Sequence, residues 1–407
     1  AWIVGRGDLL AAVLGFAAIH LHLSGRRRPW LHGLAVLAWL LALFGKLAAA
    51  PVPLLILLIE WRFHERRPRR WLEPATVGRY GAYAIAALVY LSVRADAMGS
   101  VFPSGPGVTW KEPQVFASVV VAGALSFRML WTAFLPAGLC ADYSADPVFD
   151  SGNLVPIAAD PLVFLAAAAV PVIVVAAVLA GRRAPLLSVG LLWFFLALIP
   201  VAQAIRIGAV MADRFLYLPS AGIALLLGAG LVALPRFRVP AGAVLLAALC
   251  VLTWHREAAW RDDFSMNRDV LKASNYPANA DAWNRLGLAH SRAGDRAAEL
   301  DAYREGLRHA PANRYLLKNF GAALVQAGRL PEAREALTAA LSHSRSMDLQ
   351  AAKIVYNLAL VLMRQGEAAE AARLLDRALE EAGRLPADLR QRMTVLRDRA
   401  RRIAAPR

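Results

Sequence analysis

Long apolar runs fill the first 255 residues, whereas residues 256–407 alternate apolar and polar positions as soluble helices do. A helix that crosses a bilayer needs about 20 predominantly apolar residues. The runs therefore predict membrane spans at 8–24, 30–45, 47–61, 76–94, 161–180, 185–204, 214–234 and 239–255. The expected fold class is all-α: a polytopic transmembrane helix bundle of about eight or nine spans over residues 1–255, followed by a soluble helical domain.

Two regions do not fit a simple row of spans. The segments 30–45 and 47–61 are short for two crossings, and Pro51 with Pro53 predicts a broken or tilted helix in the second. Segment 113–140 is apolar but has Arg128 near its middle. It is either one long tilted span or a helix at the membrane interface, and the pattern does not decide between the two.

Four arginine clusters separate the predicted spans, at 26–28, 62–70, 182–183 and 236–238. Short loops rich in Lys and Arg stay in the cytoplasm. Counting spans between the clusters puts all four on one side if segment 113–140 begins and ends on the outer side or is paired with a further span. The residues after 255 are then expected on the opposite side. Because the enrichment in Ala, Arg and Leu favours a bacterium, the prediction is a multi-pass inner-membrane protein with a periplasmic soluble domain.

The soluble part has a repeat of 34 residues. Gly287 and Gly321 are 34 residues apart, as are Gly294 and Gly328. This pattern resembles the tetratricopeptide repeat (TPR), in which small residues stand where two helices cross. A TPR α-solenoid of three units is expected over residues 280–385, with units at 280–313, 314–347 and 352–385. A linker, 256–279, precedes it, and a basic capping helix with its tail, 386–407, follows it.

A TPR array presents a concave surface that can bind a protein or a peptide. We expect this partner-binding face around Trp283, Asn284, Asn319 and Asn357. The alternative is that the array is only a spacer or a structural cap. The basic tail is interpreted first as a solvated face, with binding of anionic lipid or acidic peptide as the less favoured alternative. Nucleic acid is not expected as a partner of a domain outside the cytoplasm.

Composition and charge narrow the function classes. Of the 407 residues, 58% are hydrophobic and 19% are charged, against about 45–50% and about 25% in soluble domains. These values exclude a single soluble enzyme, a disordered chain and a disulfide scaffold, and Cys140 and Cys250 lie far apart in apolar surroundings. The lipid bilayer is therefore the first expected partner. The net charge of +16 comes from the arginine clusters and the tail.

Ionisable residues at the outer ends of spans are costly in apolar surroundings and tend to be paired or functional. The stretch MADRFLYLPSAG carries Asp213, Arg214 and Tyr217 at such an end. Arg214 can hold a phosphate or pyrophosphate through two parallel hydrogen bonds. The alternative is an Asp–Arg anchor at the interface with a tyrosine of the aromatic belt.

Arg6, Asp8 and Lys46 are outer-side charges of the same kind. Their simpler roles are helix capping by Asp8 and snorkelling by Lys46, and the alternative for Lys46 is contact with a phosphate. The acidic loop 141–150 lacks metal-ligand spacing, so no metal site is predicted, although a loose divalent-cation site stays open. No cofactor is expected, and the sequence motifs of serine-triad, CxxC, HExxH and P-loop chemistry are not present.

Several of these stretches together resemble one known family. WIVGRGDLLAA, GKLAAAPVPLLILLIEW, LPAGLCADYS and MADRFLYLPSAGI, followed by a last span and TPR units, are similar to the transmembrane and TPR repeat-containing proteins and their bacterial relatives. These belong to the GT-C glycosyltransferase superfamily. The resemblance implies a polytopic enzyme that takes a sugar from a polyprenyl-phosphate carrier and transfers it to an acceptor on the non-cytoplasmic face. Eukaryotic members transfer mannose from dolichyl phosphate to Ser or Thr of proteins.

The resemblance also implies site residues near the donor phosphate. The residues that match the family's motifs are Arg6, Asp8, Asp213, Arg214, Tyr217 and Pro219. Lys46 matches the Lys of a Lys–Glu pair, but Leu47 stands where the Glu is expected. In the implied inverting transfer, Arg214 and Arg6 hold the phosphate, Asp213 and Asp8 orient them, and a carboxylate acts as general base.

In the family the catalytic carboxylate lies in the first outer loop, which would precede Ala1. We therefore expect an N-terminally truncated chain that lacks its general base. One alternative function is an O-antigen ligase or polymerase-like oligosaccharide transferase, which calls for a large outer loop, whereas the loops 95–112 and 141–160 are short. The other is a non-enzymatic, membrane-anchored TPR scaffold for envelope assembly, which would leave the outer-side charges without a role.

Overall fold

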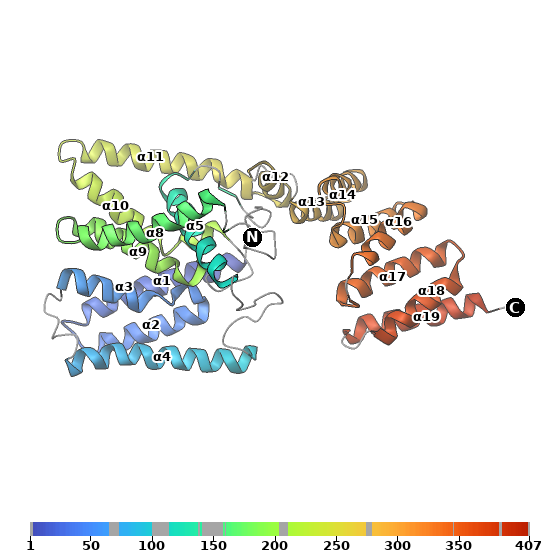
Figure 1. Ribbon diagram of the computed structural model, residues 1–407, viewed down its shortest axis with the longest axis horizontal. Coiled ribbons are helices and arrows are strands. Elements are labelled where there is room, and N and C mark those ends of the chain that lie inside the picture. Colours follow the sequence, from blue (N-terminus) through green and yellow to red (C-terminus); the bar gives the residue numbers. More distant parts are fainter. Residues whose placement is uncertain are drawn as a thin grey trace. The chain divides into compact units, whose positions relative to one another are not determined.

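All secondary structure in the described residues is helical, without a strand, so the expected all-α fold class is confirmed. The structure is a computed structural model that describes residues 3–64, 73–99, 114–136, 139–140, 158, 160–202, 211–273, 279–344, 346–381 and 385–405. By its internal contacts the chain divides into two units, Ala1–Leu252 (unit 1) and Thr253–Arg407 (unit 2), which are described separately (Figure 1).

Unit 1 is a bundle of apolar helices. They are α1 (Ile3–Ser24), α2 (Leu31–Gly45), α3 (Val52–Ile59), α4 (Pro74–Met98), α5 (Gln114–Phe134), α8 (Pro161–Ala180), α9 (Pro185–Leu198), α10 (Ser220–Val232) and α11 (Arg238–Glu257), which runs on into unit 2. Four segments of the described chain are long and apolar enough to cross a membrane, Arg6–Ser24, Phe116–Phe134, Pro161–Ala180 and Arg238–Trp260. Three further apolar helices in the described chain are shorter: Leu31–Gly45, Pro185–Val201 and Ser220–Val232.

The structure shows what the irregular segments of the sequence become. Segment 113–140, whose role the pattern left open, contains α5, which packs along α8 and has the length and composition of a span. The expected span 47–61 is instead a 3-10 turn, η1 (Leu47–Ala49), then the eight-residue α3 and a π-helical turn, η2 (Glu60–His64). Pro51 lies between η1 and α3, where its missing N–H interrupts a helix least.

The expected span 214–234 begins later than predicted. Residues Asp213–Leu216 form a separate 3-10 turn, η5, and α10 starts only at Ser220. The reason is Pro219, because a proline disfavours helical conformation in the residue before it and fits best at a helix start. The acidic–Arg–aromatic motif therefore lies on a short turn in front of the helix.

Gly222 of α10 packs directly on the backbone of α9. A Cβ atom at this position would collide with the carbonyl oxygen of Gly190 and would lie 3.0 Å from the amide nitrogen of Phe194. Because both neighbours are backbone atoms, they cannot rotate away. This contact brings α10, and with it η5, close to α9.

We expect Gly222→Ala to destabilise unit 1 by about 1–3 kcal/mol, since overpacking forces backbone shifts. The measurement is the unfolding midpoint of the purified chain in mixed micelles titrated with SDS. Gly228→Ala on the same helix is the matched control, because a Cβ there meets nothing within 4 Å. Equal midpoints for the two variants would contradict the close packing of α9 and α10.

Unit 2 is a stack of helix pairs. Its helices are α12 (Asp263–Ala273), α13 (Ala280–Ala293), α14 (Arg296–His309), α15 (Arg314–Gln326), α16 (Leu330–Ser342), α17 (Leu349–Arg364), α18 (Ala368–Glu381) and α19 (Ala387–Ala404). The two helices of each pair are joined at a glycine with positive φ: Gly294, Gly328 and Gly366. Helices α13, α15, α17 and α19 are neighbours in one layer, and α14, α16 and α18 form the other.

The repeated small residues stand where the sequence pattern requires them. A Cβ on Gly287 would collide with the ring of Tyr303, and one on Gly321 would lie 2.6 Å from Cγ of Leu337. These contacts are the crossing points of α13 with α14 and of α15 with α16. The 34-residue spacing is thus a packing requirement, and the C-terminal solenoid of the predicted fold class is confirmed.

Candidate functional site

Asp8 is a buried carboxylate near the start of α1, only 4% exposed. The Lys46 Nζ donates a hydrogen bond of 2.9 Å to Asp8 Oδ2. The Arg214 Nε lies 3.6 Å from the same oxygen. Two cations from distant parts of the sequence therefore share one carboxylate oxygen, and we call Asp8, Lys46 and Arg214 the outer charge cluster.

Local geometry explains why α1 and Lys46 meet. Helix α2 ends at Gly45, and Lys46 is extended, with φ −165°, before η1 begins. The two helices approach closely at this point, because a Cβ on Gly7 would lie 3.2 Å from the carbonyl oxygen of Gly45. The break in the chain after α2 thus leaves the Lys46 side chain beside Asp8.

Arg214 is held in place by the turn on which it lies. The Trp193 indole Nε1 on α9 donates to the Leu218 carbonyl oxygen at 2.9 Å, which ties the segment after η5 to the bundle. The Arg214 guanidinium carbon lies 5.4 Å from the centre of the Phe215 ring. With 20% of its side chain exposed, Arg214 is fixed on one side and accessible on the other.

A narrow cleft opens beside the outer charge cluster. Asp8 and Arg214 are its charged wall, and its apolar wall includes alanines from α1 and η1. Tyr217 also lines it and is 48% exposed. Lys46, with 31% of its side chain exposed, reaches Asp8 from the side of η1. The cluster thus places two cations against one carboxylate beside a cleft of about 10 Å³.

The structure brings together four of the six residues predicted near a donor phosphate: Asp8, Lys46, Arg214 and Tyr217. Arg6 is exposed two residues earlier on α1 and does not line the cleft, and Asp213 is half-buried on η5. The ion pairs also differ from the expected ones. The resemblance implies that Asp213 and Asp8 orient Arg214 and Arg6, whereas in the structure Asp8 contacts Lys46 and Arg214. Lys46 thus finds its carboxylate on another helix, although Leu47 occupies the neighbouring position.

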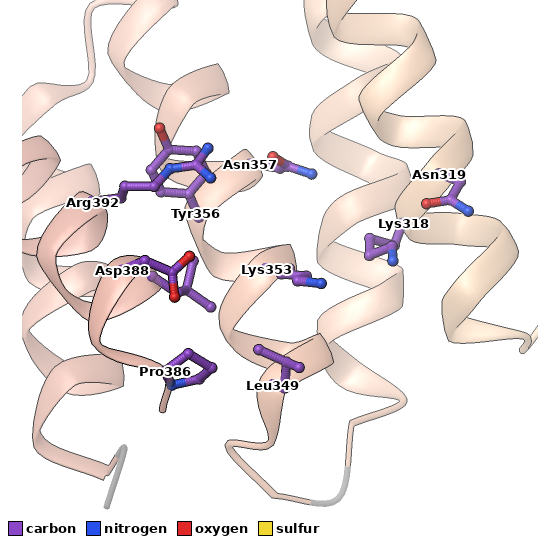
Figure 2. Close-up of a pocket in the computed structure, with 10 residues that line it drawn as sticks. Lys318, Asn319, Leu349, Lys353, Tyr356, Asn357, Pro386, Asp388 and Arg392 are labelled. Atoms are coloured by element: carbon purple, nitrogen blue, oxygen red, sulfur yellow. The ribbon is translucent and has the colours of Figure 1, made fainter. Parts of the chain in front are cut away.

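The four residues predicted for the partner-binding face, Trp283, Asn284, Asn319 and Asn357, do not all line one surface. Asn319 Nδ2 donates to Asn284 Oδ1 at 2.6 Å, and Asn319 and Asn357 line a pocket of unit 2 (Figure 2). Trp283 does not line that pocket; its Cβ is 2.7 Å from where a Cβ of Gly306 would lie. It packs against the hydrophobic core of unit 2.

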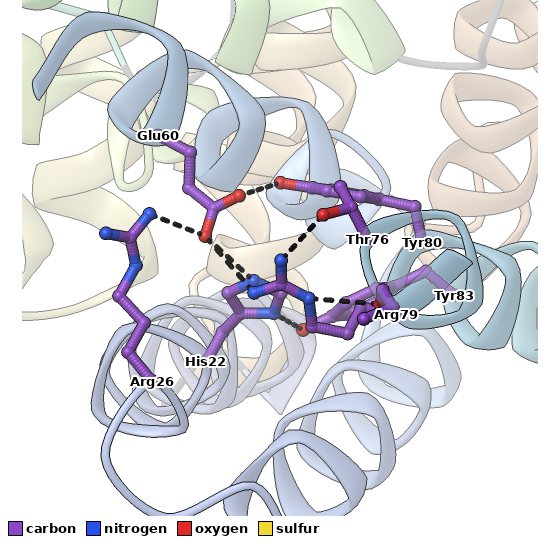
Figure 3. Close-up of polar contacts among 8 residues, drawn as sticks. His22, Arg26, Glu60, Thr76, Arg79, Tyr80 and Tyr83 are labelled. Carbon is purple, nitrogen blue, oxygen red and sulfur yellow. Dashed lines mark hydrogen bonds and ion pairs between the residues drawn. The ribbon is translucent and has the colours of Figure 1, made fainter. Parts of the chain in front are cut away.

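Glu60 forms a second charged cluster that the sequence did not reveal. It is 1% exposed and lies at the end of α3 (Figure 3). Its Oε1 accepts from Arg26 Nη2 at 3.2 Å and lies 3.9 Å from Arg79 Nη1, while its Oε2 accepts from Tyr80 Oη at 2.8 Å. His22 Nε2 is 3.5 Å from Oε1.

The Glu60 cluster joins the ends of three helices. His22 is on α1, Arg79 and Tyr80 are on α4, and Glu60 follows α3. Because Asp8 and His22 are 14 residues apart on α1, the two clusters are separated by about 21 Å along that helix. The basic turn Arg182–Arg183 is also at the Glu60 end, since Gly181 packs near Arg62. Figure 1 shows the α8–α9 and α10–α11 turns at one end of unit 1.

The signal that could have found Glu60 is its position at the end of an apolar segment. An ionisable group there is expensive unless it is paired. Glu60 is followed by Arg62 and the basic run 62–70, however. The preference of Lys- and Arg-rich loops for the cytoplasm already explains those charges, so nothing in the sequence marks Glu60 as a partner of one of them. The acidic loop predicted as an open cation site, 141–150, lies outside the described residues. Within the residues that the structure describes, no three His, Cys, Asp or Glu side chains converge as metal ligands would.

Comparison with known proteins finds one repeat family and several related proteins. Residues 319–386 match the tetratricopeptide repeat family. Protein O-mannosyl-transferase Tmtc2 of Drosophila melanogaster is 34% identical over 140 residues, 32% of this chain and 14% of that protein. Protein O-mannosyl-transferase Tmtc3 of the same organism is 27% identical over 242 residues, 54% of this chain and 25% of that protein.

Protein O-mannosyl-transferase TMTC4 of Mus musculus is 32% identical over 129 residues, 29% of this chain and 17% of that protein. The chain thus spans between 14% and 25% of the length of these relatives. It contains TPR units, and in parts of its sequence it is similar to protein O-mannosyl-transferases.

Proposed function

We propose that this chain is a membrane glycosyltransferase, or part of one, that binds a sugar on a polyprenyl-phosphate carrier at the outer charge cluster. The observation that carries the proposal is the meeting of Lys46 and Arg214 on one oxygen of the buried Asp8. The similarity to protein O-mannosyl-transferases supports mannose as the sugar and Ser or Thr of a protein as the acceptor.

The cluster suits a lipid-linked phosphate for electrostatic reasons. Two cations, Lys46 and Arg214, contact the single carboxylate of Asp8 beside the cleft. Lys46 and Arg214 keep 31% and 20% of their side chains exposed, so a ligand can approach both cations. Charge-assisted hydrogen bonds of this kind are about twice as strong as neutral ones. A carrier lipid in the bilayer would present its phosphate at the end of the apolar helices, where the cleft opens.

The chemistry that follows is stabilisation of a leaving group. When the sugar leaves, negative charge grows on the carrier phosphate, and fixed cations lower the free energy of that transition state. We assign Arg214 and Lys46 to this role. Asp8 is a positioning residue, because both cations already contact it. The acceptor hydroxyl needs a carboxylate as general base, and we place that group in the outer loop that the family resemblance implies.

We further propose that unit 2 engages the acceptor or a partner protein and that the outer charge cluster faces the non-cytoplasmic side. The basic turns near Arg62 and Arg183 support this orientation, because Lys- and Arg-rich loops stay in the cytoplasm and these turns are at the other end of unit 1. The composition favours a bacterial inner membrane, which would put unit 2 in the periplasm.

The test is a transfer assay with the full-length protein, the first outer loop included, in nanodiscs, with polyprenyl-phosphate [¹⁴C]mannose as donor and a Ser/Thr-rich peptide as acceptor. We expect Arg214→Met to lower transfer about 100-fold or more, as loss of a charge-stabilising group does. Arg183→Met is the matched control at the opposite end of the bundle, and it should transfer like the wild-type chain. Equal transfer by the two variants would refute the site, and no transfer by the wild-type full-length protein would favour a scaffold.

A further inference from the structure

Unit 2 has a cavity of about 400 Å³ between α15, α17 and the start of α19 (Figure 2). We call it the cap groove and define it by the residues that line it. They are Lys318 and Asn319 on α15, Leu349, Lys353, Tyr356 and Asn357 on α17, and Pro386, Asp388, Leu389 and Arg392 at α19. The C-terminal helix, expected to be a cap, therefore supplies one wall of this groove.

Positive charge predominates in the cap groove. Lys318, Lys353 and Arg392 line it, against the single carboxylate of Asp388. Burial lowers the pKa of Lys318, and the neighbouring charges of Lys353 and Arg314 lower it further. Its ammonium donates to a neutral acceptor, Gln350 Oε1, at 2.9 Å. The charge of these lysines is thus under-compensated, and an anionic ligand would relieve their mutual repulsion.

The remaining side chains of the groove are of the kind that bind a peptide. The Arg392 guanidinium lies 4.9 Å from the centre of the Tyr356 ring, which holds its charged end at the groove wall. Asn319 and Asn357 carry amide groups that can bond to a peptide backbone. Leu349 is 39% exposed at one end and provides an apolar contact.

We propose that the cap groove binds an extended acidic peptide segment, with carboxylates on Lys318, Lys353 and Arg392 and an apolar side chain near Leu349. The inference rests on the proposed function only in assigning partner binding to unit 2. A peptide suits the groove better than a bilayer surface, because its cations line a recess together with two amides. A flat anionic membrane would instead favour a protruding basic face.

The experiment measures fluorescence anisotropy of a labelled peptide of alternating Glu, Asp and Leu with the whole chain in neutral-lipid nanodiscs and no donor lipid. We expect Lys353→Met and Arg392→Met each to weaken binding about 10-fold, the effect of one charged hydrogen bond. Lys272→Met, an exposed lysine on α12, should leave binding unchanged. A peptide with Gln and Asn in place of the acids should bind at least about 10-fold more weakly. Added salt should weaken the binding of the acidic peptide.

Two results would overturn the proposal: equal binding of the acidic and the amide peptides, or equal binding by the wild-type chain and Lys353→Met. Preferential binding of phosphatidylglycerol vesicles, lost in the same variants, would assign the groove to anionic lipid instead. Because Lys353 is exposed, its variant is expected to keep the wild-type melting temperature, which excludes unfolding as the cause. Arg214→Met should bind the acidic peptide normally, so failure of this inference is distinguishable from failure of the proposed function.

Discussion

Glu60→Ala is expected to lower the free energy of unfolding of unit 1 by about 3 kcal/mol. Glu60 is almost fully buried and accepts from Arg26 and Tyr80. Its removal leaves two guanidinium groups near one another without their shared anion. The value is at the lower end for a broken buried ion pair, because the arginines keep 30% and 24% of their side chains exposed.

The change is measured by SDS titration of the chain in dodecylmaltoside micelles. Glu257→Ala, at an exposed glutamate, is the matched control and should shift the midpoint little. Glu60→Gln should fall between the two, because the amide still accepts from Tyr80 but has no charge for Arg26. If Glu60→Ala unfolded at the same midpoint as Glu257→Ala, the Glu60 cluster would not be holding α1, α3 and α4 together.

Asp8→Ala should destabilise unit 1 by about 1–3 kcal/mol, through the loss of a buried acceptor that faces two cations. The expected loss is smaller than for Glu60, since Lys46 and Arg214 have access to solvent at the cleft. Lys46→Met alone should cost less, because Asp8 keeps Arg214 as a partner.

The double variant tests whether these residues act as a pair. Asp8→Ala combined with Lys46→Met should be less destabilised than the sum of the single variants, by about 0.5–3 kcal/mol. The quantities compared are the unfolding free energies of the four proteins in the cycle. Strict additivity would mean that the hydrogen bond between Lys46 and Asp8 contributes nothing to the fold.

Much of the fold follows from local patterns in the sequence. The run of apolar residues in 161–180 predicts a helix with the same bounds as α8, and the 34-residue spacing of Gly294 and Gly328 marks the turns within the helix pairs. Both signals are read from positions along the chain alone: the first from one continuous run and the second from a fixed spacing. The start of α10 was misplaced because a hydropathy pattern does not include the effect of Pro219 on the backbone before it.

The candidate site shows where sequence reasoning stops. Asp8, Lys46 and Arg214 were each recognisable as charges at the outer ends of apolar segments. Their meeting at one oxygen depends on the close approach of α1 and α2 and on the Trp193 bond that fixes the segment after η5, which no spacing along the chain encodes. The sequence does not reveal the Glu60 cluster for the same reason. Its hydrogen bonds and ion pairs depend on which helix ends lie close together in the fold.

The most direct measurement is equilibrium binding of ³²P-labelled undecaprenyl phosphate to the chain in nanodiscs. If the outer charge cluster holds the carrier phosphate, Arg214→Met and Lys46→Met should each weaken binding about 10- to 100-fold, the range for a hydrogen bond to a charged group. Arg183→Met, at the opposite end of the bundle, should bind like the wild-type chain. Equal affinities for all four proteins would contradict the assignment of a lipid-phosphate site to Asp8, Lys46 and Arg214.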